Sequence, residues 1–392
     1  MRKIFTVFPV LVALCVGCSG LPERNPVPEE FAAKAQIPGI PDARYWADDA
    51  PADASIWIDM EASEFMRQYP EIVGVPHNYL AISGGGPRGA FAAGFLNGWT
   101  ATGTRPDFIF VTGVSTGALI APFAFLGSDY DYIIEEVYTK TSTDDILEKR
   151  SLWKVVTLDA ATDSSPLRRL IAQHFDEQVM QAVAEKYRRG FSLVIITTDL
   201  DAGRPVAWDI GAIATSGQPN ALQLIHDVLL ASAAIPAVFP PVMIEVEANG
   251  EIYDEMHVDG GTTSQLHLYP LELDVAERIE RLEIIGEPTV YVIRNGHVKA
   301  HYESVDRSTV AIAAAAMGTL MGNISYGDMY RIYLETRRDG IAFRLAYVPE
   351  SFDEPLTEPF DTAYMSKLYK LGYELAVDGY DWKTAPPGLL PE

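Results

Sequence analysis

The chain has 392 residues, of which 48% are hydrophobic and 21% charged, a composition typical of a folded globular protein. Its 54 acidic and 30 basic residues give a net charge of −24, which argues against nucleic acid as a main partner and against electrostatic docking on anionic lipid. The only two cysteines, Cys15 and Cys18, stand near the start, so the body of the chain has neither a disulfide scaffold nor a cysteine-based zinc site.

The first residues of the chain are typical of a secretory signal. Arg2 and Lys3 supply a positive start, and an almost entirely apolar stretch follows from residue 4 to residue 16. This stretch is short for a transmembrane helix, since a spanning helix needs about 20 apolar residues. We therefore expect it to direct export rather than to cross a membrane.

The end of this signal resembles that of a bacterial lipoprotein. In Cys15-Val16-Gly17-Cys18 a small residue precedes the last cysteine, and the resemblance implies that Cys18 becomes the lipidated first residue. Cys15 replaces the leucine that is usual at its position, so a plain cleaved signal with an incidental cysteine is the alternative. Ser19 differs from the aspartate that resembles an inner-membrane retention signal. The expected location is therefore the bacterial cell envelope, with a lipid anchor in the outer membrane.

The segment after the signal is expected to be a tether between anchor and domain. Its hydrophobic periodicity is weak, and proline recurs at positions 22, 26, 28, 38, 41 and 51, as in a semi-rigid spacer. Further along, no internal repeat occurs and no linker is long or polar enough to divide the chain. The predicted organisation is a signal with its lipidation site at residues 1–18, a tether at 19–54 and one domain at 55–392.

The body of the chain alternates between strand-like and helix-like segments. Short apolar runs predict strands at 79–82, 108–112, 192–197, 206–209, 256–258, 289–293 and 343–348. Helical spacing predicts helices at 88–99, 113–125, 133–138, 144–156, 166–187, 220–233, 311–334 (broken around 322–327) and 361–377. This alternation indicates an α/β fold with a mostly parallel central sheet flanked by helices.

One motif has the form of a nucleophile turn. Gly113-Val114-Ser115-Thr116-Gly117 lies between a predicted strand and an apolar helix, the context that such a turn requires. The turn is sharp, so the flanking Gly113 and Gly117 must be small, and the Ser115 hydroxyl would stand at a helix N-terminus that favours developing negative charge. A turn whose serine merely caps the helix is the alternative.

A second glycine-rich turn, residues 84–89, also lies between a predicted strand and a helix. Its sequence is Gly-Gly-Gly-Pro-Arg-Gly, and successive N–H groups at a helix start make a cradle for an anion. No Gly-Lys-Ser/Thr follows, which excludes a Walker-type phosphate loop. The nucleophile candidate about 30 residues further on favours an oxyanion hole, with Arg88 adding positive charge. A nucleotide-phosphate site and a purely structural turn are the alternatives.

A serine nucleophile also needs a base. The order Ser, acid, His of an ordinary α/β hydrolase requires a catalytic histidine. None of the seven histidines stands in an obvious catalytic loop, and a surface or satisfied core role is the better reading for each: His77, His174, His226, His257, His267, His297 and His301. Asp259-Gly260-Gly261 follows a strand-like run, but by itself it reads as an ordinary turn. At residues 231–241 a helix of small residues ends in an apolar, proline-rich turn. We expect this stretch to belong to the core, and the wall of an apolar pocket is the alternative.

Together, these four stretches resemble the patatin-like phospholipases in order and approximate spacing. Residues 164–168 and 197–200 also look like stretches seen in that family, and the resemblance covers about residues 77–265. It implies a three-layer α/β sandwich and a Ser-Asp dyad, in which Ser115 attacks the acyl ester and Asp259 is its base. It further implies an oxyanion site formed by Gly84, Gly85, Gly86 and Arg88. The family cleaves fatty-acyl esters of lipids and needs no metal or other cofactor at such a site.

The sequence therefore predicts a lipid-anchored serine acyl hydrolase acting on lipid esters, with membrane contact through the anchor and no nucleic-acid partner. A free aspartate, with a pKa near ~3.9, is a weak base, so Asp259 needs an apolar cleft that raises its pKa. His257, two residues before it, is a lesser candidate for proton transfer. The alternatives are an esterase with a conventional triad and a non-catalytic envelope lipoprotein. Head group, chain length and oligomeric state stay open, as does whether residues 311–321 are core or interface.

Overall fold

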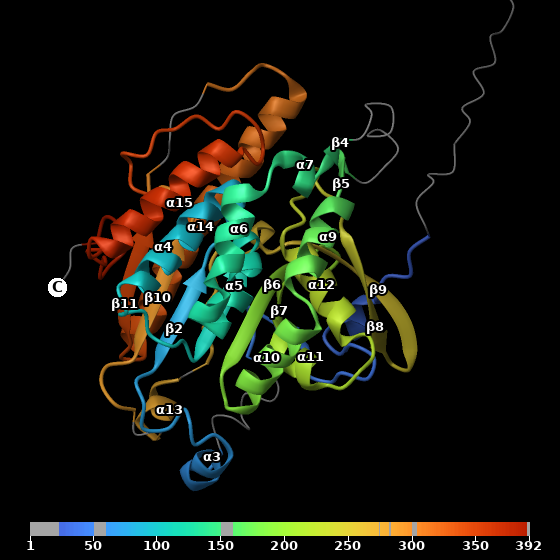
Figure 1. Ribbon diagram of the computed structural model, residues 1–392. Coiled ribbons are helices and arrows are strands. Elements are labelled where there is room, and N and C mark those ends of the chain that lie inside the picture. Colours follow the sequence, from blue (N-terminus) through green and yellow to red (C-terminus); the bar gives the residue numbers. More distant parts are fainter. Residues whose placement is uncertain are drawn as a thin grey trace, which may run out of the picture.

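The computed structural model describes residues 23–50, 60–149, 160–273, 275–281, 284–299 and 304–389. The predicted signal and Cys18 lie outside these residues, as do residues 19–22 and 51–54 of the predicted tether. In the described part, a mixed sheet runs through the centre and helices pack on it (Figure 1). This confirms the predicted fold class, an α/β fold with a mostly parallel central sheet flanked by helices.

The central sheet has nine strands, and its order along one path is β1-β7-β6-β3-β2-β10-β11. Strands β6, β3, β2, β10 and β11 run parallel, whereas β1, β7 and the hairpin β8–β9 add antiparallel pairs at the β6 side. The bounds are β1 Arg44–Trp46, β2 Asn78–Ile82, β3 Phe110–Val114, β6 Ser192–Asp199, β7 Arg204–Asp209, β8 Val242–Ala248, β9 Glu251–Asp259, β10 Thr289–Arg294 and β11 Ala342–Tyr347. A separate short pair joins β4 Glu148–Lys149 to β5 Thr162–Asp163.

Helices lie on both faces of the sheet. The longer ones are α4 Ala90–Ala101, α5 Thr116–Leu126, α6 Asp131–Lys140, α9 Ser165–His174, α10 Glu177–Arg188, α12 Ala221–Ser232, α14 Thr309–Arg338 and α15 Thr362–Val377. The shorter ones are α1 Glu29–Ala32, α3 Ala62–Gln68, α7 Thr143–Ile146, α11 Ile210–Thr215 and α13 Ala276–Arg281. Three 3₁₀ turns are also described: η1 Gly86–Gly89, η2 Ser128–Tyr130 and η3 Gly260–Thr262.

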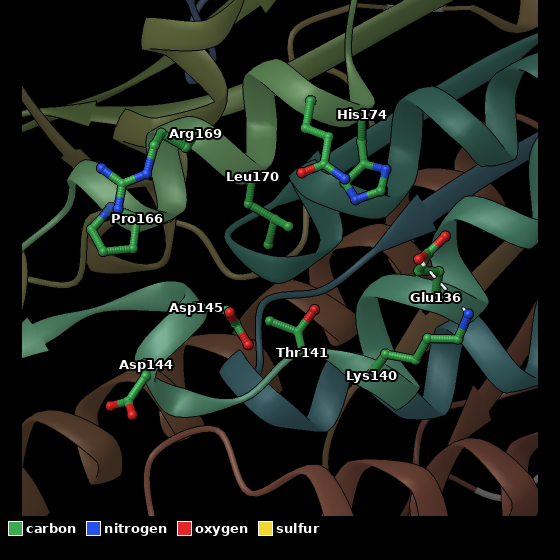
Figure 2. Close-up of a pocket in the computed structure, with 10 residues that line it drawn as sticks. Glu136, Lys140, Thr141, Asp144, Asp145, Pro166, Arg169, Leu170 and His174 are labelled. Carbon is green, nitrogen blue, oxygen red and sulfur yellow. Dashed lines mark ion pairs between the residues drawn. The ribbon is translucent and has the colours of Figure 1, made fainter.

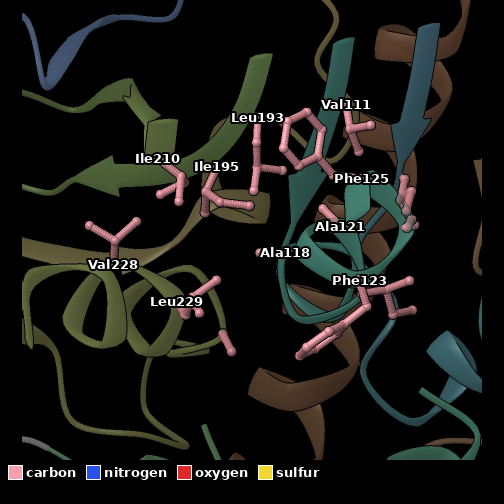
Figure 3. Packing of buried hydrophobic residues seen from close by; sticks show 14 of the residues in the cluster. Val111, Ala118, Ala121, Phe123, Phe125, Leu193, Ile195, Ile210, Val228 and Leu229 are labelled. Atoms are coloured by element: carbon pink, nitrogen blue, oxygen red, sulfur yellow. The ribbon is translucent and has the colours of Figure 1, made fainter. Parts of the chain in front are cut away.

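The core consists of separate apolar layers on the two faces of the sheet. On one face, alternate strand residues such as Val111 and Ile195 pack against α5, α12 and their neighbours (Figure 3). On the other face, Val290 and Val292 pack against the C-terminal half of α14, including Ile332. Since successive strand residues point to opposite faces, these strands are apolar almost throughout, as strands covered on both sides must be.

Several predicted elements differ from the structure. The segment predicted as one helix at 166–187 is two helices, because Asp176 ends the first and caps α10 by accepting hydrogen bonds from Gln178 and Val179. The helix predicted at 144–156 stops at Ile146, and the chain is extended at β4. Conversely, α14 is continuous through residues 322–327, since exposed helical glycine weakens a helix without ending it.

Part of the predicted tether belongs to the fold, which corrects the spacer interpretation for the described residues. Strand β1 pairs with β7, and the apolar residues between the prolines are buried, among them Ile37, Ile40 and Ala43. Proline ends regular secondary structure without preventing burial of its apolar neighbours. The hydrophobic periodicity is weak because the segment consists of short elements that pack on the sheet. Residues 23–50 therefore pack on the antiparallel side of the sheet.

Candidate active site

The predicted nucleophile lies in a strained turn. Ser115 joins β3 to α5 with a φ of 55° and a ψ of −124°, and only 3% of it is exposed. A Cβ at Gly113 would lie 2.4 Å from the carbonyl oxygen of Gly117, and one at Gly117 would lie 2.3 Å from that of Ile82. The turn therefore fits only with glycine at both positions, and a positive φ at a serine is the kind of strain that clusters at functional sites.

The structure brings Ser115 and Asp259 together. The hydroxyl Oγ of Ser115 donates a hydrogen bond of 2.6 Å to Oδ2 of Asp259, although 144 positions separate them in the chain. Asp259 ends β9, where it pairs in register with Thr197 of β6, and its backbone N–H donates to the carbonyl of Ala234. Its other oxygen, Oδ1, accepts from the N–H of Gly261 at 2.7 Å. Both carboxylate oxygens are thus fixed, and one of them points at the serine.

The surroundings of Asp259 make it a stronger base than a free aspartate. The residue is completely buried, and this burial raises its pKa from 3.8 to about 7, while the hydrogen bonds from Ser115 and Gly261 oppose the rise. Burial therefore favours the protonated carboxyl group at pH values where a free aspartate is ionised. A base with a pKa close to the working pH is well matched to general base catalysis.

The nucleophile turn is supported by a residue that the sequence did not single out. The N–H of Ser115 donates to Oγ of Ser232 at 2.9 Å, and that hydroxyl donates to the carbonyl of Ile196 at 2.6 Å. Ser232 ends α12, inside the stretch predicted as core or pocket wall. The only sequence signal was the small, helix-ending character of residues 231–241, which does not show that the serine faces the nucleophile.

The glycine-rich loop lies beside Ser115, but its glycines differ in whether their N–H groups are free to bind a ligand. The N–H of Gly84 donates to the backbone carbonyl of Gln265, so Gly84 does not supply the oxyanion donor expected of it. A Cβ at Gly84 would lie 3.1 Å from Cβ of Ser115, which explains why glycine is needed there. Within the described residues, nothing accepts a hydrogen bond from the N–H groups of Gly85 and Gly86. These two groups are the donors open to a ligand.

Asn295 also holds this loop in place. The side-chain amide of Asn295 donates to the carbonyl of Ser83 at 2.8 Å, and its oxygen accepts from the N–H of Ala92 in α4. A Cβ at Gly85 would lie 2.5 Å from the carbonyl of Asn295. Arg88 is exposed on η1. Burial raises the pKa of Tyr364, and the positive charge of Arg88 partly offsets that rise, which places Arg88 near α15.

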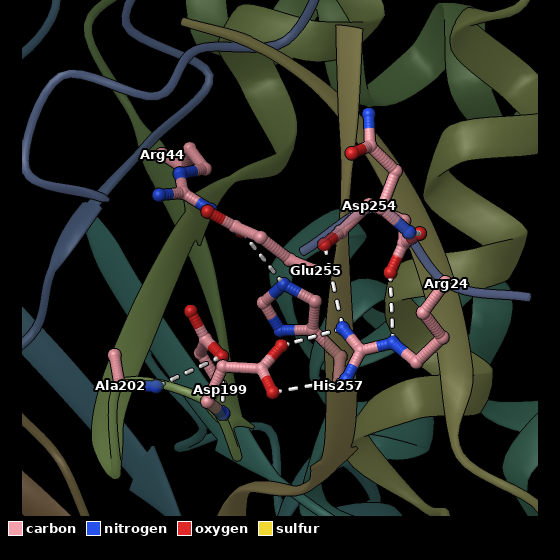
Figure 4. A network of polar contacts seen from close by, with 9 residues as sticks. Arg24, Arg44, Asp199, Ala202, Asp254, Glu255 and His257 are labelled. Atoms are coloured by element: carbon pink, nitrogen blue, oxygen red, sulfur yellow. Dashed lines mark hydrogen bonds and ion pairs between the residues drawn. The ribbon is translucent and has the colours of Figure 1, made fainter. Parts of the chain in front are cut away.

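His257 belongs to a buried polar network rather than to the nucleophile (Figure 4). Its Nδ1 hydrogen-bonds to Thr197 at 2.9 Å and its Nε2 to Glu255 at 3.1 Å, and Glu255 is ion-paired with Arg44. Burial and the charge of Arg44 hold the pKa of His257 well below its usual value. The imidazole is therefore neutral at pH 7 and its two nitrogens are engaged away from Ser115. His77 and His226 are likewise hydrogen-bonded to backbone carbonyls, those of Ile72 and Phe175.

The open cavities of the structure lie elsewhere. One of about 330 Å³ is lined by residues of α6, α7 and α9, including Lys140 paired with Glu136 (Figure 2). Neither this cavity nor the one between α10 and α11 includes Ser115 or Asp259 among its lining residues. Ser115 is nearly buried and Asp259 is completely buried, so the dyad has little direct contact with solvent in this conformation. Within the described part of the chain, no group of three or more candidate ligands could hold a metal ion.

Two comparisons with known proteins found matches. A model of the patatin-like phospholipase family matches residues 80–271, a range that contains the loop at 84–89, Ser115 and Asp259. Among solved structures, the chain is similar to the crystal structure of VipD from Legionella pneumophila, at 13% sequence identity and a TM-score of 0.37. That match covers 78% of this chain and 67% of the VipD chain. No curated protein sequence matches the chain.

Proposed function

Because the chain contains a patatin-like phospholipase domain at residues 80–271, we propose that it is a serine hydrolase that cleaves fatty-acyl esters of lipids through Ser115 and Asp259. The observation that carries the proposal is the 2.6 Å hydrogen bond from Oγ of Ser115 to a buried carboxylate whose pKa is about 7. Such a pair supplies both a nucleophile and a base of suitable strength.

The reaction proceeds in two acyl transfers. Oγ of Ser115 attacks the ester carbonyl carbon as Oδ2 of Asp259 takes its proton, and the proton then passes to the departing alcohol oxygen. This leaves an acyl ester on Ser115. A water molecule next gives a proton to Asp259 and attacks the acyl carbon; the fatty acid leaves and Ser115 regains its proton. In both steps the carbonyl oxygen becomes negative, and we assign its stabilisation to the N–H groups of Gly85 and Gly86, from which no described group accepts a hydrogen bond.

The network around His257 bears on the triad alternative. A conventional esterase needs a histidine hydrogen-bonded to the serine, whereas Ser115 donates to Asp259 and His257 is bonded to Thr197 and Glu255. We expect folded His257→Gln to keep its kcat/KM on a soluble ester within about tenfold of wild type. Loss of activity as complete as in Asp259→Asn would instead favour a triad.

The proposal also includes the location. The resemblance of residues 15–18 to a lipoprotein signal supports lipidation at Cys18 and an anchor in the bacterial outer membrane, close to the substrate. The net charge of −24 favours neutral or zwitterionic lipid over strongly anionic lipid. Incorporation of labelled palmitate into the wild-type protein but not into Cys18→Ser tests the anchor separately from the chemistry.

The decisive experiment is labelling of the chain from residue 19 with a fluorophosphonate probe. We expect the wild type to react, Ser115→Ala to lose labelling completely and Asp259→Asn to lose most of it. Ser366→Ala, at a serine whose Oγ donates to the carbonyl of Thr139 rather than to Ser115 or Asp259, is the matched control and keeps full labelling. Circular dichroism must show that all four proteins are folded. A folded wild type that does not react would refute the proposal and favour a non-catalytic envelope lipoprotein.

A further inference from the structure

Helix α14 has two halves of opposite character. Residues 308–327 contain no Asp, Glu, Lys or Arg, in a chain where 21% of residues are charged. After this run the helix carries Asp328, Arg331 and Glu335, which form ion pairs with one another. Figure 1 shows the orange N-terminal end of α14 at the top of the domain, the end toward which the β2 arrow points. The uncharged half thus projects from the end of the sheet at which the nucleophile turn begins.

The uncharged half is apolar yet lies in contact with solvent. Ile312 is 53% exposed and Leu320 is 60% exposed, and none of the described side chains from 311 to 324 is buried. The charged half, in contrast, buries Met329 and Ile332 completely against β10 and β11. An uncharged apolar surface left in water on one half of a long helix marks a site of interaction.

The few polar groups of this half are satisfied within the helix. Oγ1 of Thr319 donates to the carbonyl of Ala315, and Nδ2 of Asn323 donates to the carbonyl of Thr319, each at 2.8 Å. Ser308 caps the helix by accepting from the N–H of Ala311. Transfer of this half into an apolar medium therefore strips few polar groups of hydrogen bonds.

A chain of hydrogen bonds joins the same helix to the candidate active site. Oδ2 of Asp328 accepts from the N–H of Gln265 at 2.6 Å and from that of Leu266 at 3.0 Å. The carbonyl of Gln265 in turn accepts from the N–H of Gly84, in the loop beside Ser115. The uncharged half thus ends directly before Asp328, the residue that holds Gln265 beside this loop.

We propose that residues 311–324 of α14 dock on the surface of a zwitterionic lipid bilayer and insert their apolar side chains among its lipids. The choice of lipid as partner rests on the proposed function, since Asp328 of the same helix is linked by hydrogen bonds through Gln265 to the loop beside Ser115. A second copy of the chain fits less well, because each copy carries a net charge of −24 and would be repelled, whereas zwitterionic lipid has no net charge. In the part of the chain that the structure describes, no helix combines the length and the apolar character of a membrane span.

A probe on the helix tests this directly. The full chain has cysteine only at positions 15 and 18, so Cys15→Ser with Cys18→Ser leaves a background without cysteine or lipid anchor. In this background, also carrying Ser115→Ala, an environment-sensitive nitrobenzoxadiazole dye is attached at Leu320→Cys or at Leu334→Cys. Leu334 is the matched control, since it lies on the same helix with 63% exposure but in the charged half.

With phosphatidylcholine vesicles we expect the dye at 320 to brighten several-fold and shift to the blue, and the dye at 334 to stay unchanged. No response at 320, or an equal response at both positions, overturns the proposal. Brightening that needs no vesicles and grows with protein concentration also overturns it, in favour of a second copy. Because Ser115 is absent, these outcomes do not depend on catalysis, whose failure would show separately in fluorophosphonate labelling.

Activity supplies a second readout. For Leu320→Glu with the native serine, we expect the rate on phosphatidylcholine vesicles, divided by the rate on a water-soluble short-chain ester, to fall about tenfold. Leu334→Glu is expected to keep the wild-type ratio. An unchanged ratio in Leu320→Glu would contradict docking through this half of α14, whereas loss of both activities in every protein would contradict the proposed function instead.

Discussion

The backbone N–H of Ser115 donates to the hydroxyl of Ser232, 117 positions away, at 2.9 Å. The same hydroxyl donates to the carbonyl of Ile196 in β6 at 2.6 Å, and Ser232 is completely buried. Helix α12 therefore ends on the turn that carries the nucleophile and ties it to the neighbouring strand. Since φ at Ser115 is 55°, the turn needs such support to keep its conformation.

Ser232→Ala is expected to weaken both the fold and the site. It leaves the N–H of Ser115 and the carbonyl of Ile196 buried without this partner, which costs about 1–3 kcal/mol of unfolding free energy. Because the turn is released, we expect kcat on a soluble ester to fall about tenfold or more with a smaller change in KM. Urea unfolding and steady-state kinetics measure the two effects. Ser232→Cys, which keeps the volume, separates packing from hydrogen bonding; wild-type kcat in the alanine variant would contradict the supporting role.

The activity should follow the ionisation of Asp259. Burial raises its pKa to about 7, and only the carboxylate can take the proton of Ser115. The value of kcat/KM on a soluble ester should therefore rise about tenfold per pH unit below pH 7 and become level above it. Circular dichroism at each pH must show that the fold persists. A level profile that extends down to pH 5 would contradict Asp259 as the base.

The same pKa predicts a gain in stability when Asp259 is replaced. The folded-state pKa of about 7 lies above the usual 3.8, so between these values the native state holds a proton that the unfolded state releases. The free energy of unfolding therefore falls as pH rises through this window, and the loss is complete above pH 7. Asp259→Asn removes this loss. At ~1.4 kcal/mol per pKa unit, we expect it to be about 2–4 kcal/mol more stable than wild type at pH 8.

The pH dependence of the unfolding free energy is the control for the expected gain in stability of Asp259→Asn. Near pH 4 the folded forms of both proteins carry a neutral side chain at position 259, and the unfolded aspartate is only about half ionised, so their unfolding free energies should differ by less than ~1 kcal/mol. Thermal unfolding at pH 4 and pH 8, with activity assayed in parallel, makes the comparison. A variant that loses activity without gaining stability at pH 8 would show that the buried carboxylate is not strained.

The nucleophile turn could be predicted because its signals are local. The sequence has glycine on both sides of Ser115, between a strand and an apolar helix. These glycines are needed because the turn leaves no room for a Cβ at either position. Asp259 could be assigned only through family resemblance, because a lone Asp-Gly-Gly is an ordinary turn. Ser232, Gln265 and Asn295 carried no local signal, since each acts through a contact with a segment distant along the chain.

The hairpin β8–β9 differs from these residues, because the local sequence contained a signal for it that was not used. Residues 242–248 alternate between buried and exposed, and Asn249-Gly250 follows, the strongest short-range sign of a hairpin. Only a short strand at 256–258 was predicted there. The position of residues 23–50, by contrast, could not be predicted, because proline-rich sequence with scattered apolar residues does not show which surface it packs on.

Arg44 tests whether that N-terminal segment is part of the folded domain. It lies on β1 with 6% exposure, ion-paired with Glu255, which also bonds to His257. Burial lowers the pKa of Arg44 to about 10, so it stays charged at neutral pH.

Removing this charge should leave Glu255 buried without its ion-pair partner. Arg44→Met should therefore lower the free energy of unfolding by about 3–5 kcal/mol, because an uncompensated buried charge is costly. Adding Glu255→Gln should restore much of this loss. Arg24 is the matched control, since its ion pairs with Asp201 and Asp254 are partly exposed, and Arg24→Ala should cost about 0–1 kcal/mol. Guanidinium unfolding followed by tryptophan fluorescence measures the three variants and the wild type. Equal, small losses for Arg44→Met and Arg24→Ala would mean that β1 contributes little to the stability of the domain.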